Sequence, residues 1–249
     1  MGNKWILKTK NYVEGKYRLF CLPYAGGGAG IYRNWQQYFD DRIEVCPIQL
    51  PGRENRMNEM LIDDAMLLSQ MIVRGLMAYQ DKPFSIFGYS AGGILAYEMA
   101  KLTKKIWNNS PDGLFMGATT LDFSYQKDSV CNKGEDEFIQ YLLELGGTNE
   151  ESIKSQEFRK VFMPIIRNDY KMTTDYKCSG VTKEFPICAF ASKEDEEVPY
   201  AKTLELKDYT MDFEIHDFEG KHFFINEHQE KMCQIINDII LERFLINEL

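Results

Sequence analysis

The sequence predicts an α/β fold in which a mostly parallel sheet is covered by helices on both faces. Three observations predict it. Short apolar runs alternate with helical patterns along most of the 249 residues, one such run leads into a glycine-flanked turn and a helix, and a helical insertion interrupts the alternation. A chain of this length with 44% hydrophobic residues can bury one sizeable core. We therefore expect a single domain, residues 1–249, with an insertion at about 123–178.

The first half of the chain supplies three strands and two helices. The first strand breaks at Pro23 and enters the glycines 26–28, and the second ends at the run Leu50-Pro51-Gly52-Arg53. Asp63 or Asp64 can cap the helix that follows, because a carboxylate accepts the free amide hydrogens at a helix start. The expected strands are 17–22, 43–48 and 84–87, and the expected helices are 31–39 and 64–77.

The second half of the chain contains three further strands and the insertion. We expect the strands at 114–118, 186–191 and 211–217, with a helix after each of the last two and the final helix at about 224–244. Between them, residues 123–178 show no convincing strand but helical stretches at 135–145, 150–166 and 167–175. In a sheet protein, an insertion after the fourth or fifth strand is well placed to form a lid over the active-site edge. The alternative is a helical decoration with no gating role.

Composition narrows the class of function. A net charge of −9 with no basic run disfavours nucleic-acid binding, and no apolar stretch reaches the roughly 18–20 residues that span a bilayer. The first residues lack the features of a signal peptide, and Ile6 stands where myristoylation requires Ser or Thr. The cysteines form no C-x-x-C pair, as is typical of reduced thiols; they are Cys21, Cys46, Cys131, Cys178, Cys188 and Cys233. We expect a cytoplasmic protein, monomeric by default, that binds neither nucleic acid nor membrane.

Residues 86–93 read Ile-Phe-Gly-Tyr-Ser-Ala-Gly-Gly, an apolar strand that runs into Gly88-x-Ser90-x-Gly92 and then into a helical pattern. This is the arrangement of a nucleophile elbow, the strained turn on which α/β-hydrolases hold a catalytic serine. A bare G-x-S-x-G also occurs by chance, but the strand before it and the helix after it disfavour that alternative. Ser90 is therefore the candidate nucleophile.

A serine nucleophile needs a histidine base and a carboxylate, which follow it in the chain in the order acid, then histidine. Of the three histidines, His216 lies within a strand pattern and His228 on the final helical pattern, whereas His222 lies in a glycine-containing loop after a strand. The three are spaced six and six apart, which matches no usual zinc pattern. Hydrolysis by a serine, a histidine and a carboxylate requires neither a metal nor a cofactor, and we expect none. His222 is the candidate base.

Asp195 is the candidate acid, because it follows the expected strand 186–191 and precedes a helix start. It lies among glutamates, so an acidic solvated turn is the alternative, and Asp122, one strand earlier, is the rival acid. For the oxyanion hole we expect two backbone amides, that of Ala91 after the nucleophile and that of Ala25 in the loop after the first strand. That glycine-rich loop could also hold a phosphate, but its spacing matches neither a P-loop nor a dinucleotide fingerprint.

The chain resembles the stand-alone type II thioesterases of non-ribosomal peptide and polyketide synthesis nearly from end to end. The matching motifs are Leu22-Pro23-Tyr24-Ala25-Gly26-Gly27, Gln49-Leu50-Pro51-Gly52-Arg53-Glu54, the elbow, Met163-Pro-Ile-Ile-Arg167-Asn168-Asp169-Tyr170, Asp195-x-x-Val198 and Gly220-x-His222-Phe223-Phe224. The chain departs from the family at Tyr89, where relatives often have His, at Gly117 to Asp122, where they often show Ser-Gly-x-x-Ala-Pro, and at Ser192, where they have glycine.

The resemblance implies a thioesterase of the α/β-hydrolase fold that removes acyl groups from the phosphopantetheine arm of acyl or peptidyl carrier proteins and so clears stalled synthases. Carrier domains are commonly acidic, as is this chain, so we expect docking through a local apolar or basic patch, with Arg53 and Arg56 as candidates or else a solvated loop. Two alternatives remain: a small-molecule carboxylesterase or lipase with the same triad, and a non-catalytic α/β-hydrolase that only binds a ligand.

Overall fold

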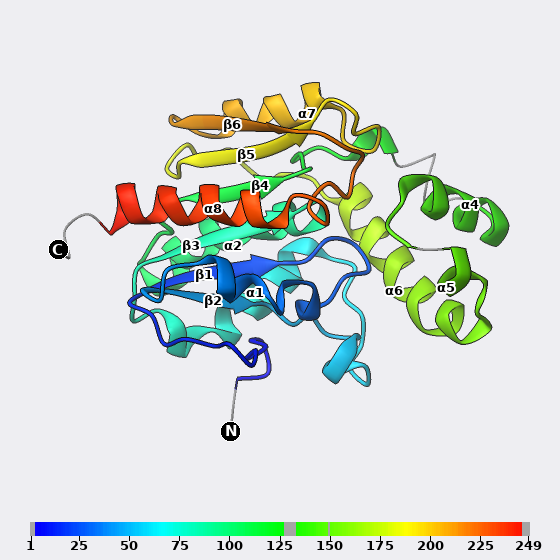
Figure 1. Cartoon of the computed structure of the whole chain (residues 1–249), viewed down its shortest axis with the longest axis horizontal. Helices are drawn as coiled ribbons and strands as arrows, with labels where there is room; N and C mark the ends of the chain where they lie inside the picture. The colour runs from blue at the N-terminus through cyan, green and yellow to red at the C-terminus, as the bar shows by residue number, and fades with distance from the viewer. Residues whose placement is uncertain (1–2, 127–132, 149, 246–249) are drawn as a thin grey trace.

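A computed structural model describes residues 3–126, 133–148 and 150–245. Its centre is a six-stranded sheet with the order β2-β1-β3-β4-β5-β6, in which every neighbouring pair is parallel (Figure 1). The strands are β1 Tyr17–Leu22, β2 Ile43–Pro47, β3 Phe84–Tyr89, β4 Leu114–Gly117, β5 Ile187–Ser192 and β6 Phe213–Phe218. Since all strands run the same way, their carboxyl ends meet at one edge of the sheet, where α/β proteins place their sites.

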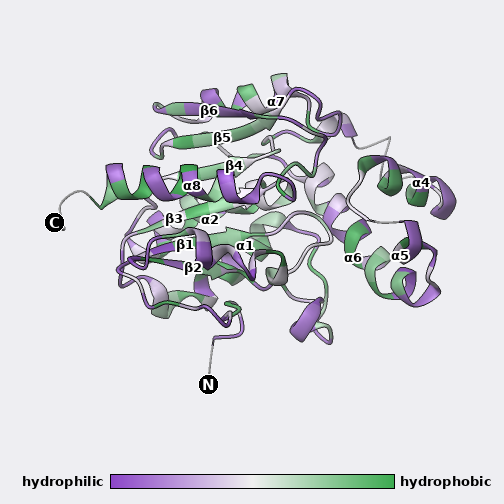
Figure 2. Ribbon diagram, viewed as in Figure 1, coloured by the Kyte–Doolittle hydropathy of each residue, from purple (hydrophilic) through white to green (hydrophobic). Residues whose placement is uncertain are grey.

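Helices cover both faces, because alternate residues of each strand point to opposite sides. On one face, α1 (Ala65–Gly75) and α2 (Ala91–Trp107) pack on residues such as Phe20, Ile86 and Met116. On the other face, α8 (Gln229–Ile239) packs on Leu19 and Phe87 and crosses the front of the sheet in Figure 1. The short α7 (Tyr200–Leu204) lies between β5 and β6 in the chain. Figure 2 shows the hydrophobic residues concentrated in the central strands and α2. The predicted fold class is thereby confirmed.

The helical insertion lies between β4 and β5 and projects beyond one end of the sheet (Figure 1). It consists of η5 (Ser124–Gln126), α4 (Glu135–Leu145), α5 (Glu150–Lys154) and α6 (Gln156–Asp175), and it has a small core of its own. The two helices expected at 150–166 and 167–175 are instead a short α5 and one long α6. The reason is that Ser155 caps a new helix by accepting the amide hydrogen of Phe158, and that helix then continues past Pro164.

Two expected helices begin or fold differently. The segment 31–39 forms two 3₁₀ helices, η1 (Ala29–Tyr32) and η2 (Trp35–Tyr38), because the Gln36 side chain bonds the backbone of β2 and fixes the tight turn. The last helix begins at Gln229 rather than 224, since tight turns occupy residues 221–228, and it ends in a π-helical turn, η7 (Ile240–Phe244). Across the described ranges, no helix is both long and apolar enough to cross a membrane.

Candidate active site

Ser90 stands on the turn between β3 and α2 with a strained backbone. Residues other than glycine rarely adopt its backbone angles, a φ of 53° and a ψ of −120°, and such strain costs about 1–3 kcal/mol. The two flanking glycines leave no room for a side chain: a Cβ on Gly88 would lie 2.2 Å from the Gly92 carbonyl oxygen, and one on Gly92 would lie 2.4 Å from that of Leu22. The elbow predicted from the sequence is thus enforced by close backbone packing.

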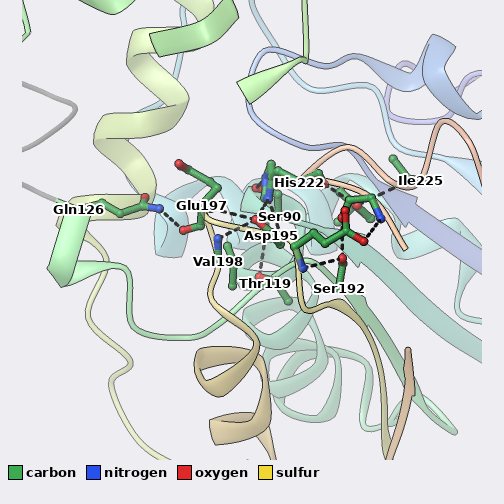
Figure 3. A network of polar contacts seen from close by, with 12 residues as sticks. Ser90, Thr119, Gln126, Ser192, Asp195, Glu197, Val198, His222 and Ile225 are labelled. Carbon is green, nitrogen blue, oxygen red and sulfur yellow. Dashed lines mark hydrogen bonds and ion pairs between the residues drawn. The ribbon is translucent and has the colours of Figure 1, made fainter. Parts of the chain in front are cut away.

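Ser90, His222 and Asp195 come together at the carboxyl edge of the sheet (Figure 3). The Nε2 atom of His222 lies 3.0 Å from the Ser90 hydroxyl oxygen, and its Nδ1 atom lies 2.9 Å from Oδ2 of Asp195. All three side chains are buried, with exposed fractions of 8%, 2% and 4% for serine, histidine and aspartate. A carboxylate only accepts hydrogen bonds, so Nδ1 carries the proton and Nε2 is free to accept the serine proton.

The backbone around Asp195 orients its carboxylate. The amides of Glu197 and Val198 both donate to Oδ1 at 2.9 Å, which leaves Oδ2 for the histidine. A carboxylate held in this orientation can stabilise a histidine that takes up a proton. Asp122, the rival acid, is instead exposed and lies 3.7 Å from Lys202.

The other two histidines have contacts of a different kind. His216 stacks on Phe190 and pairs with Glu214 at 2.9 Å, and His228 precedes α8 with its Nε2 atom 3.1 Å from the Glu219 carbonyl oxygen. Within the described ranges, no three His, Cys, Asp or Glu side chains gather in a way that could hold a metal ion.

Three residues that depart from the family pattern support the site. The Tyr89 hydroxyl donates to the His222 carbonyl at 2.7 Å, and the Thr119 hydroxyl donates to the Ser90 carbonyl at 2.8 Å. The Ser192 hydroxyl donates to the Gly220 carbonyl and ties the loop of the acid to the loop of the base. Sequence analysis noted these three positions only as departures. Their hydroxyls, placed at or just after the ends of β3, β4 and β5, were the available signal.

Ala25 and Ala91, whose amides were expected to form the oxyanion hole, lie in the loop after β1 and directly after Ser90. Ala91 is the first residue of α2, so its N–H has no partner within the helix. Ala25 follows β1 and lines the cavity that contains Ser90 and His222. Among the described residues, no polar contact occupies its amide, whereas the next amide, that of Gly26, donates to Asp169 at 2.8 Å.

Arg53 and Arg56, expected on a docking patch or a solvated loop, are buried, so that interpretation is wrong. Only 3% of Arg53 is exposed, and its guanidinium forms a two-pronged ion pair with Asp169 of α6. Arg56 is equally enclosed: it donates to the Gln49 carbonyl at 2.7 Å and lies over the Trp5 ring. Backbone carbonyls and paired carboxylates offset the cost of removing both charges from water.

A cavity of about 350 Å³ opens beside Ser90 and His222, between the sheet edge and the helical insertion. The loop after β1 forms one side, and the opposite wall comes from the insertion and is largely apolar: Leu142, Leu145, Phe158, Phe162, Ile166 and Tyr170. Such a wall suits an uncharged, apolar group attached to a carbonyl at Ser90.

A second cavity of about 230 Å³ touches the other side of His222 and is acidic. Its lining includes Glu197, whose carboxylate accepts a hydrogen bond from Tyr141 of α4. Burial raises the pKa of Glu197 above its ordinary value, since the charged form loses water. The side chain of Gln126, the last residue of η5 in the insertion, donates to the Glu197 backbone carbonyl at 2.7 Å (Figure 3). The insertion is therefore joined to the loop that carries Asp195.

Comparison with known proteins agrees with this geometry. The family model described as "Thioesterase domain" matches residues 17–240. The chain is 31% identical to the gramicidin S biosynthesis protein GrsT of Aneurinibacillus migulanus, over 94% of this chain and 93% of that protein. It is 33% identical to the human S-acyl fatty acid synthase thioesterase, medium chain, over 85% of this chain and 82% of that protein.

Among solved structures, the type II thioesterase BorB from the borrelidin biosynthetic cluster superposes with a TM-score of 0.83 at 27% identity, covering 95% of this chain and 97% of BorB. The resemblance to type II thioesterases and the α/β-hydrolase fold that it implied are thus confirmed. With a family match across nine-tenths of its length, and with a serine on an elbow turn beside a cavity, the chain belongs to the thioesterase family of thioester hydrolases.

Proposed function

We propose that this thioesterase hydrolyses acyl groups held as thioesters on the phosphopantetheine arm of carrier proteins, with Ser90, His222 and Asp195 as its catalytic residues. One observation carries the assignment: the Ser90 hydroxyl lies 3.0 Å from a histidine whose other nitrogen lies 2.9 Å from a buried carboxylate. The relatives GrsT and BorB, named for gramicidin S and borrelidin biosynthesis, support an editing role that frees blocked carriers of non-ribosomal peptide or polyketide synthases.

In the first half of the reaction, His222 takes the Ser90 proton on Nε2 as the serine oxygen bonds to the thioester carbonyl carbon. The amides of Ala25 and Ala91 hold the oxyanion, and each such donor contributes about 3–4 kcal/mol of transition-state stabilisation. Collapse breaks the carbon–sulfur bond, and the departing pantetheine sulfur receives the proton from His222.

In the second half, water replaces the thiol. His222 removes a proton from that water as its oxygen bonds to the acyl carbon, and collapse of the second tetrahedral intermediate returns the proton to Ser90. Asp195 stays ionised and stabilises the imidazolium in both halves. The residues present supply every proton transfer, and the products are the free acid and the free pantetheine thiol.

The cavity and the insertion support an acyl substrate. We assign the apolar wall to the acyl chain and the insertion at about 123–178 to a lid on this single domain, because α4 and α6 form one side of the cavity. The human relative is named as a medium-chain S-acyl fatty acid synthase thioesterase, and the phenylalanines of the wall favour a second candidate function, release of a medium-length chain from a carrier. We place the enzyme in the cytoplasm, as a monomer.

The test is thiol release from acetyl-phosphopantetheinyl carrier protein, measured for wild type and Ser90→Ala. Ser69→Ala is the matched control, since Ser69 is also buried but lies on α1, where its hydroxyl bonds to none of the residues that the structure describes. We expect the first variant to lose all turnover above background and the second to keep it. Turnover that survives Ser90→Ala would overturn the assignment of the nucleophile.

Two further substrates separate the functions. Octanoyl carrier protein turned over much faster than the acetyl form would favour chain release over editing. A p-nitrophenyl ester cleaved well, with no turnover of either carrier, would show a general esterase. Absence of all three activities in folded protein would show a non-catalytic binder.

A further inference from the structure

A fully buried ion pair joins the loop after β2 to the helical insertion. Arg53 and Asp169, 116 residues apart, are each 3% exposed, and the guanidinium contacts the carboxylate at 2.6 and 2.9 Å. Burying two charges costs much of what their attraction returns, and apolar side chains of similar size often stabilise such a position equally well. Stability alone therefore does not explain this ion pair, and the other hydrogen bonds of Arg53 and Asp169 indicate its role.

Both members of the pair hold the backbone of the loop that contains Ala25. The amide of Gly26 donates to Oδ2 of Asp169 at 2.8 Å, and Nη1 of Arg53 donates to the Gly27 carbonyl at 3.0 Å. Gly26 has a φ of +78°, and a Cβ there would lie 2.6 Å from a carbon of Ile166 on α6. Two successive residues of the loop are thus fixed by one ion pair and one helix.

These contacts determine which amide faces the substrate. Asp169 occupies the Gly26 amide, whereas nothing in the described part of the chain bonds the amide of Ala25, which lines the same cavity as Ser90. Fixing the peptide between Ala25 and Gly26 also fixes the backbone angle of Ala25, and with it the direction of the Ala25 N–H. An oxyanion donor works only when it is oriented before the reaction, within a few tenths of an ångström.

We propose that Arg53 and Asp169 are positioning residues that orient the Ala25 amide in the oxyanion hole. The proposal rests on the function proposed above, because it takes Ser90 as the nucleophile and Ala25 as a donor. Since Asp169 lies on α6, the insertion contributes to the oxyanion hole as well as to the acyl cavity. The hole is complete only while the second half of α6 stays against the loop after β1. Asn168, which donates to the Ile62 carbonyl at 3.0 Å, holds the helix there.

The test uses Asp169→Asn, which keeps the size of the side chain but turns an amide NH₂ or a weaker acceptor toward its partners. We expect kcat for acetyl carrier protein to fall about 10- to 100-fold with KM within twofold, because the lost interaction exists only in the transition state. The inhibition constant of octylboronic acid, which forms a tetrahedral adduct with an active serine, should rise by a similar factor. A purely structural role would lower the melting temperature and leave kcat, KM and boronate affinity of the folded enzyme unchanged.

Glu44→Gln is the matched control. Glu44 is fully buried on β2 and pairs with the buried Arg18 on β1 at 3.1 Å. Both residues lie near the beginnings of their strands, away from Ser90. Glu44→Gln should lower stability and leave boronate affinity unchanged. The exchanged double variant Arg53→Asp/Asp169→Arg restores opposite charges but removes the acceptor for the Gly26 amide. It should therefore recover stability without recovering kcat.

Two results would overturn the proposal: Asp169→Asn with wild-type kcat and boronate affinity, or an exchanged pair that restores kcat in full. If Asp169→Asn does not fold, Arg53→Lys answers the same question, since it keeps the charge but loses the two-pronged contact. Failure of the proposed function is seen separately, as turnover that persists in Ser90→Ala.

Discussion

Tyr89→Phe tests how the elbow holds the base. The Tyr89 hydroxyl donates to the His222 carbonyl at 2.7 Å and accepts from the Ile225 amide at 3.4 Å, so one oxygen fastens the loop of the base to the strand of the nucleophile. The ring is fully buried. Phenylalanine keeps the ring and its packing, and it removes only that oxygen. The substitution therefore separates the positioning of His222 from the packing of the core.

The size of the effect follows from the groups left behind. A buried backbone carbonyl or amide without a partner costs about 1–3 kcal/mol in unfolding free energy. In a chain of this size each kcal/mol lowers the melting temperature by about 2–4 °C, so we expect a fall of about 2–12 °C. If the substitution also destabilises the transition state by about 1 kcal/mol, because His222 must stay aligned with Ser90 there, kcat falls about fivefold.

Tyr97→Phe is the control for this experiment. Tyr97 is also buried, and its hydroxyl makes the same two kinds of bond, to the carbonyl and amide of Thr182 at 3.2 and 2.9 Å, in the segment before β5. Thermal melts and thiol-release kinetics of both variants should show similar losses of stability but a lower kcat only for Tyr89→Phe. Equal kcat losses in both variants, or an unchanged kcat in Tyr89→Phe, would refute the positioning role.

Three other predictions concern single positions. Burial raises the pKa of Glu197 above its ordinary value of 4.5, so the folded state binds the proton of this carboxyl group more tightly than the unfolded state does. Wild type therefore loses stability as the pH rises from 4.5 through the raised pKa. In thermal melts from pH 4 to 8, Glu197→Gln should become increasingly more stable than wild type as the pH rises. Gly92→Ala should lower the free energy of unfolding by about 1–3 kcal/mol or prevent folding, because its Cβ meets the Leu22 carbonyl oxygen. Gly134→Ala, whose Cβ meets nothing within 4 Å, should cost less than about 1 kcal/mol in the same denaturation assay, because it only replaces the glycine at the N-cap of α4. Leu145→Ala should raise the KM for octanoyl carrier protein about fivefold and leave the KM for acetyl carrier protein unchanged, because only the longer acyl chain loses about 1 kcal/mol of apolar contact. An equal effect on both KM values would show that the wall does not hold the acyl chain.

The sheet and the elbow could be predicted because their signals are local. The strands β1 to β5 are short, mostly apolar runs in which every residue is buried, as a strand covered on both faces requires, whereas the edge strand β6 is largely half-buried. The glycines of the elbow are needed by contacts within a few residues and with β1, so their spacing carries the information. Since parallel strands end at one edge, locating Ser90, Asp195 and His222 after strands was enough to bring them together.

Helix boundaries were less predictable, because they depend on contacts that periodicity does not contain. The apolar spacing in 31–39 suits a helix, yet Gln36 bonds β2 and holds two short turns instead. Residues 224 and 225 look like a helix start because they are apolar. They are buried in turns that bring the loop of His222 back to Tyr89. In both cases a tertiary contact outweighed a propensity of a few tenths of a kcal/mol per residue.

Arg53 shows why a charge is the hardest residue to interpret in a sequence. An arginine after a Pro-Gly turn is ordinarily solvated, and only a partner that is buried with it can make burial tolerable. That partner, Asp169, lies 116 residues away on a helix of the insertion, so no window of sequence contains both. The two motifs that hold them were each noted for resemblance to the family, but each contains one arginine and one acidic residue, so their charges did not show which two side chains would pair. Only the fold brings Arg53, which follows a strand, against Asp169 on an inserted helix, and the bridge between them reaches the backbone of the glycine loop that lines the cavity of Ser90.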